Sequence, residues 1–123
     1  MKTKIVLGLI LFSLLLVITS LFTYSQHLDR QEHIRYTATY DYLTTGKNYN
    51  TDEIYRIDVK FSLENLFFGY PQWTIAVTFN DEPNVNYYYQ YADGRISQGG
   101  LSGSTPNNIY THVEGAENGL DKN

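Results

Sequence analysis

The chain has 123 residues, a net charge of −4, no cysteine, 42% hydrophobic residues and twelve tyrosines. Once an apolar N-terminal stretch is set aside, about a hundred residues remain, which is enough for one small domain. The lack of cysteine excludes disulfides, thiol catalysis, cysteine-based zinc sites and iron–sulfur clusters. The acidic excess argues against a nucleic-acid partner, because phosphate binding needs clustered Lys and Arg.

The first predicted element is an apolar helix. Residues Ile5–Phe22 contain no charged side chain, and Lys2 and Lys4 precede them. This length is at the lower limit for spanning a bilayer, and the two lysines predict a cytoplasmic N-terminus with an extracytoplasmic C-terminal domain. A cleaved signal peptide has a shorter apolar core and a better cleavage site than the one at Ser25. We therefore expect a single-pass anchor in the cell membrane, and secretion after cleavage near Ser25 is the alternative.

The next segment, from Ser25 to Thr45, is compatible with two structures. Residues 34–42 alternate in polarity as a strand does, whereas Asp29 and Glu32 have the spacing of a capping box and Gly46 suits a helix end. The segment is longer than an ordinary strand. We predict a second helix that ends at Gly46.

Three segments with alternating apolar and polar residues predict strands, at 55–61, 73–79 and 85–91. Asp93-Gly94 predicts a two-residue hairpin turn that pairs Ala92 with Arg95 and adds a fourth strand. The side chains expected on the buried face are Tyr55, Ile57, Val59, Phe61, Trp73, Ile75, Val77, Phe79, Val85, Tyr87, Tyr89, Tyr91 and Ile96. Those expected on the wet face are Arg56, Asp58, Lys60, Thr74, Thr78, Asn86, Tyr88 and Gln90.

The expected fold class is therefore α+β: an N-terminal transmembrane helix, then a helix packed on a three- to four-stranded antiparallel meander. Residues 1–25 would form the membrane anchor or signal segment, and residues 26–98 the extracytoplasmic domain. The Gly-, Ser- and Asn-rich residues 99–123 would form a flexible tail.

The order of these segments resembles a family. The anchor, the helix closing on Gly46, the strand at 73–79 and the run Asp81-Glu82-Pro83-Asn84-Val85 are similar to small uncharacterised membrane-anchored proteins of Gram-positive bacteria, the domain of unknown function 3139 type. A small extracytoplasmic domain without disulfides is typical of such bacteria. The resemblance covers roughly residues 1–100 and implies topology without a mechanism. At the level of fold pattern alone, the chain also resembles PepSY-type modules, some of which are thought to regulate proteases.

No group of side chains predicts catalysis, a cofactor or a metal. The acidic residues that invite a carboxylate-based site are Asp52, Glu53, Asp58, Asp81, Glu82 and Asp93. They lack EF-hand spacing, and adjacent acids in a turn are usually solvated. His27 and His33 are six residues apart, which is not the ligand spacing of one helix face, so we expect these two and His112 to be surface histidines.

The connector between the first two strands is unusually apolar, because it contains Leu66, Phe67, Phe68 and Tyr70. These side chains are candidates for a contact with a partner or with the membrane. We expect instead that they close one end of a small core, since small domains recruit loops for packing.

These observations favour a non-enzymatic, membrane-anchored extracytoplasmic module that binds or regulates another envelope protein. One alternative is an enzyme or enzyme accessory with a carboxylate-based site, and another is a small immunity or envelope-stress protein. The enzyme alternative requires Asp58, Asp81 and Glu82 to meet in one concave pocket.

Overall fold

The computed structural model describes residues 1–114. One long helix, α1 (Lys2–Asp41), opens the chain and continues into a π-helical turn, Tyr42–Gly46. The chain divides into two compact units, Met1–Gln31 and the residues from Glu32 onward. The expectation of two separate helices was wrong. No Gly or Pro lies between Gly8 and Gly46, so nothing interrupts the helix where the apolar run ends.

The first unit is helical, and its residues 5–22 carry no charge on any side of the helix. It belongs to the one helix among the described residues that is long and apolar enough to cross a membrane, with a mean hydropathy of 2.9 over its most apolar window. None of that window is buried within the protein. The Thr19 and Thr23 hydroxyls donate to carbonyl oxygens four residues earlier, which satisfies them without water. By its length and composition, such a helix can serve as a single-pass anchor or as a signal sequence.

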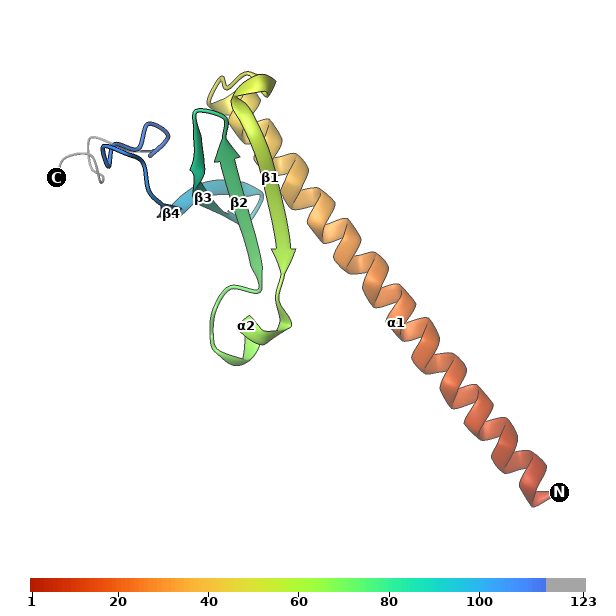
Figure 1. The fold of residues 1–123 in the computed structure, drawn as a ribbon. Helices are drawn as coiled ribbons and strands as arrows, with labels where there is room; N and C mark the ends of the chain where they lie inside the picture. The colour runs from red at the N-terminus through yellow and green to blue at the C-terminus, as the bar shows by residue number, and fades with distance from the viewer. Residues whose placement is uncertain (115–123) are drawn as a thin grey trace. The chain divides into compact units, whose positions relative to one another are not determined.

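The second unit contains a four-stranded antiparallel sheet with the order β1-β2-β3-β4 (Figure 1). Its elements after the π-turn are a 3₁₀ turn (Thr51–Glu53), β1 (Ile54–Phe61), α2 (Leu63–Phe67), β2 (Trp73–Phe79), β3 (Glu82–Ala92) and β4 (Arg95–Gly103). This is the expected α+β meander.

The predicted hairpin turn between β3 and β4 is confirmed. Asp93 and Gly94 have φ values of 52° and 74°, as a type I′ turn requires at both central positions. Ala92 pairs with Arg95, which is the register that a two-residue loop imposes.

Two expected side-chain positions on the sheet were wrong. Tyr55 is 65% exposed, because the pairing of β1 with β2 shifts register between Ile54 and Arg56, and Ile54 instead packs against the core. Thr78 was expected in water but is buried, and its hydroxyl donates to Asn86 Oδ1 over 2.8 Å.

The C-terminal boundary of the sheet also differs from the expected one. β4 runs to Gly103, so residues 99–103 are part of the sheet and were wrongly placed in a tail. Beyond it, Tyr110 and Val113 pack against the core. The rest of the expected tail, residues 115–123, lies outside the described residues.

The core lies between the inner face of the sheet and the end of α1. Buried Leu43 comes from the π-turn, and Tyr42 meets Tyr89 edge-on with 6.1 Å between ring centroids. Nearer the start of this unit, the Arg35 guanidinium lies 4.5 Å from the centroid of the Trp73 ring. The buried hydrophobic residues are Leu43, Val59, Ile75, Val77, Phe79, Val85, Tyr87 and Tyr89.

Candidate functional site

A polar cluster lies beside the turn between β2 and β3. It consists of Asp81 in that turn, Glu82 at the start of β3, and His112 in the segment after β4; we call it the His112 cluster. His112 Nε2 lies 2.7 Å from Asp81 Oδ1 and 3.8 Å from Glu82 Oε1. The side chains of His112 and Glu82 are only 10% and 6% exposed, whereas that of Asp81 is 60% exposed.

The His112 ring is held on two sides. It stacks on Phe79 with 3.9 Å between centroids and an interplanar angle of 18°. Its Nδ1 atom forms a 2.8 Å hydrogen bond with the Tyr49 hydroxyl. The expectation of a surface histidine was therefore wrong. The ring packs on Phe79 and shields this end of the core from solvent. The arrangement brings together Tyr49, Phe79 and His112, which are far apart in the chain.

Glu82 is held by donors from β3 and from the C-terminal segment. Its Oε2 accepts from the Tyr87 hydroxyl over 2.9 Å, and its Oε1 accepts from the Thr111 amide over 2.9 Å and from the Thr111 hydroxyl. Burial, followed by the hydrogen bond to Glu82, raises the pKa of Tyr87, so this phenol stays a donor. The expectation that Glu82 is solvated was wrong, because these donors replace water.

The His112 cluster has the composition of a divalent-metal site. The three residues each offer one ligand atom, and these atoms lie within 4.8 Å of one another. One imidazole with two carboxylates suits zinc or a similar ion, and a hydrogen bond to the other ring nitrogen is the usual support of a ligating histidine.

The three carboxylates that the enzyme alternative requires in one pocket, those of Asp58, Asp81 and Glu82, do not meet. Asp58 forms an ion pair with Lys60 over 3.3 Å on β1, away from Asp81 and Glu82. The cavity beside Asp81 and Glu82 has a volume of about 210 Å³. That is smaller than the roughly 300–1,000 Å³ of ordinary small-molecule sites. The other candidate side chains, on His27, His33, Asp52, Glu53 and Asp93, are on exposed residues.

A second feature is the α2 loop, which we define as residues 62–72 between β1 and β2. The Ser62 hydroxyl caps α2 by accepting from the Asn65 amide over 3.4 Å. The Tyr70 amide donates to the Asn65 carbonyl over 2.9 Å, and the Ser62 amide donates to the Gln72 carbonyl over 2.7 Å. These bonds close the loop at both ends, and Gly69 supplies a φ of 74°.

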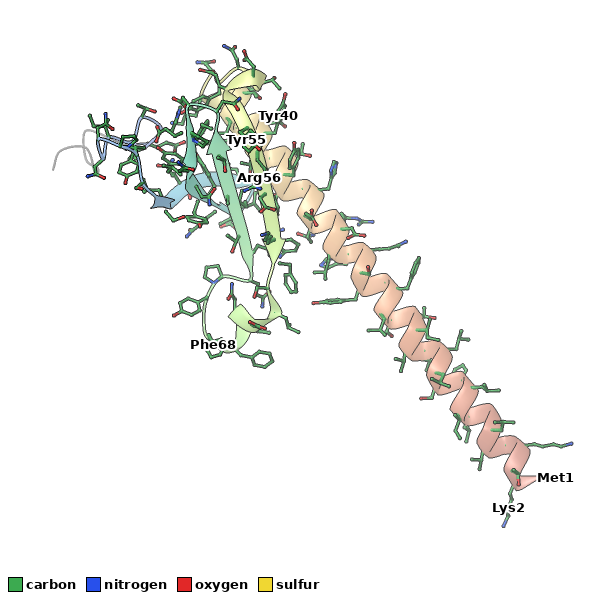
Figure 2. The ribbon with its side chains drawn as sticks, viewed as in Figure 1. Met1, Lys2, Tyr40, Tyr55, Arg56 and Phe68 are labelled. Carbon is green, nitrogen blue, oxygen red and sulfur yellow. The ribbon has the colours of Figure 1, made fainter. Side chains whose placement is uncertain are left out.

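The large side chains of the α2 loop point into solvent. Phe67 is 79% exposed, Phe68 73%, Tyr70 66% and Leu66 52%. Figure 2 shows Phe68 at the tip of the loop, beyond the ends of the strands. The expectation that these residues close the core is therefore wrong. Leu63, 54% exposed, belongs to the same surface but was missed, as was α2, although Ser62 is a typical N-cap residue.

No curated protein and no solved structure is significantly similar to the chain, so the likeness to PepSY-type modules gains no support. One family model, described as "Protein of unknown function (DUF3139)", matches residues 1–89. The matched range includes α1, the α2 loop, Asp81 and Glu82, and it ends before His112. Because this match covers most of the chain, the protein belongs to the DUF3139 family.

Proposed function

We propose that this protein is a non-enzymatic binding module, held outside the cytoplasmic membrane by α1, which acts on another envelope protein and uses the α2 loop as its contact surface. The observation that carries this proposal is the exposure of four large apolar side chains at adjacent positions of one loop, Leu66, Phe67, Phe68 and Tyr70.

Exposed apolar residues are ordinary when they are scattered, but contiguous ones usually mark an interaction site. The hydrogen bonds of Ser62, Asn65 and Tyr70 hold the loop in one conformation before anything binds. A preorganised loop loses little conformational entropy on contact, which favours binding. These residues lie within the range shared with the family.

The N-terminus of the mature protein shows whether α1 is retained as an anchor or removed by cleavage. If α1 is retained, peptides containing Lys4 should be found by mass spectrometry in the membrane fraction. External protease should remove the β-domain from intact cells, because Lys2 and Lys4 favour a cytoplasmic N-terminus. A soluble protein beginning near Gln26, or a protected domain, would contradict this placement.

The contact surface is tested by a photo-crosslinking amino acid at Phe68 in the full chain, in membranes of the native host. We expect a crosslinked product from Phe68 and none from Lys60, whose side chain is equally accessible at 74% exposure but lies on the open face of β1. Equal products from both positions, or none from Phe68, would refute the role of the loop.

The His112 cluster supports a second candidate function, an enzyme or enzyme accessory with a carboxylate-based metal site. Titration of the full chain in detergent with Zn²⁺ alone should then show binding that His112→Gln abolishes, while the matched change His33→Gln, on an exposed part of α1, leaves it intact. Absence of binding would remove the support for this candidate.

A further inference from the structure

We infer that a cavity beside the α2 loop binds a carboxylate group, and that an acidic side chain of the envelope partner supplies this group. The cavity has a volume of about 310 Å³, and its lining includes Arg35, Trp73 and Tyr91. We call it the Arg35 pocket. Because the partner itself rests on the proposed role of the α2 loop, the pocket deepens that proposal by specifying what the partner must carry.

Two aromatic rings position the guanidinium group of Arg35 within the second unit. It lies 4.5 Å from the centroid of the Trp73 ring and 5.3 Å from that of the Tyr91 ring, within the range of a cation–π contact. Both rings pack against the core, and the Trp73 ring also meets Phe61 with 5.1 Å between ring centroids. The guanidinium is therefore placed before a ligand arrives, which lowers the entropic cost of binding.

The contacts with the rings do not use the hydrogen-bond donors of Arg35. A guanidinium has five N–H donors, and two of them match the two oxygens of a carboxylate. Arg35 can therefore bind a carboxylate while it keeps a bond within the chain.

The charge of the pocket also matches a carboxylate. Among the described residues that line the pocket, Arg35 is the one basic residue and none is acidic. A single positive charge matches a single carboxylate, whereas phosphate sites usually combine a cation with several backbone N–H groups. The volume lies at the lower end of the roughly 300–1,000 Å³ of small-molecule sites, which suits one acidic side chain.

The Arg35 pocket and the α2 loop are continuous, which is why we assign the carboxylate to the partner. Pro71 and Gln72 are the last residues of the loop and also line the pocket. Residues 62–72 contain no Lys or Arg, so the loop itself offers apolar contacts and no positive charge. A partner that covers both would place apolar residues on the loop and an acidic side chain at Arg35, where exclusion of water strengthens the ion pair.

The emission of Trp73, the only tryptophan, reports directly on the pocket. The full chain in detergent is titrated with N-acetylglutamate α-amide, with the neutral glutamine analogue of the same shape, and with sodium chloride at equal ionic strength. We expect a saturable change in emission with the glutamate compound alone. No change, or the same change with the glutamine analogue, overturns the carboxylate site.

Three variants test the role of Arg35, and a thermal melt verifies that each is folded. Arg35→Gln should weaken binding of the glutamate compound at least about ten-fold. Arg35→Lys keeps the charge beside the rings but lacks the planar pair of donors, and it should weaken binding at least about three-fold. Arg56→Gln removes the same charge from an exposed residue of β1 and should leave binding intact. Binding that is unchanged in a folded Arg35 variant overturns the assignment.

The photo-crosslink from Phe68 in native membranes identifies the source of the carboxylate. If the partner supplies it, Arg35→Gln should lower the yield of the crosslinked product at least about five-fold, and Arg56→Gln should not. A successful titration with an unchanged crosslink yield assigns the pocket to a free small carboxylate and overturns the partner as its source. If Phe68 crosslinks but the titration fails, the proposed function stands without this pocket. If the titration succeeds but Phe68 does not crosslink, the role of the loop fails and the carboxylate site remains.

Discussion

Gly103, the last residue of β4, should be the least replaceable glycine of the sheet. Its φ is +96°, a conformation that side chains with a Cβ rarely adopt. A Cβ added there would overlap the Asn84 carbonyl oxygen and approach the Val85 Cα to 3.1 Å. Gly103 is the pairing partner of Val85, a fully buried core residue, so the backbone can yield only by separating β4 from β3.

We expect Gly103→Ala to lower the free energy of unfolding by about 2–4 kcal/mol. Backbone strain accounts for about 1–3 kcal/mol of this loss, and each ladder hydrogen bond lost at the strand end accounts for about 1 kcal/mol. A small domain has a total stability of about 5 kcal/mol. The melting temperature should therefore fall by at least about 10 °C. The assay is a thermal melt of the full chain in detergent, followed by the emission of Trp73.

The matched control is Gly100→Ala on the same strand. An added Cβ at Gly100 meets nothing within 4 Å, and its φ is not positive. This substitution should be neutral or stabilise by up to about 1 kcal/mol, because alanine restricts the unfolded chain. If Gly103→Ala melts within about 2 °C of Gly100→Ala, the close approach of β4 to Asn84 is refuted.

Three further predictions concern the hairpin turn, the His112 cluster and the tyrosines. Gly94→Val should lower the free energy of unfolding by about 1–3 kcal/mol, because Gly94 has a φ of +74°, where a β-branched side chain is strained. An unchanged melting temperature would exclude a tight turn at this position. Glu82→Ala should lower the free energy of unfolding by about 2–4 kcal/mol, because several hydrogen-bond donors lose their acceptor. Asp81→Ala, at a side chain that is 60% exposed, should lower it by less than about 1 kcal/mol. Equal losses of stability in denaturant titrations of the two variants would contradict the burial of Glu82. Burial raises the pKa of Tyr49 from 10.0 to about 12, so the neutral phenol stabilises the fold below pH 10 and this contribution is lost as the pH rises from 10 through about 12. Melts across this range should therefore show a loss of stability that is smaller in Tyr49→Phe; an equal loss in both proteins would assign the effect to other groups.

The candidate site was only partly accessible from the sequence. The apolar composition of the α2 loop singled out Phe67 and Phe68, but composition cannot say whether such residues face a core or water. The His112 cluster could not be predicted from spacing, because His112 lies 31 residues from Asp81 along the chain. Its one local hint was that the run from Asp81 to Val85 is the most distinctive part of the family resemblance.

Local patterns in the sequence determined the elements of this protein. An uncharged run of eighteen residues predicts a membrane helix, polarity with a period of two predicts the strands, and Asp93-Gly94 predicts the hairpin and its register, because each depends on neighbouring residues alone. Only the tertiary structure decided that α1 continues unbroken to Asp41, that a shift in strand pairing turns Tyr55 to solvent, and that the side chains of Glu82 and His112 are largely shielded from solvent. Those outcomes depend on contacts between residues distant in sequence, whose energies no local pattern contains.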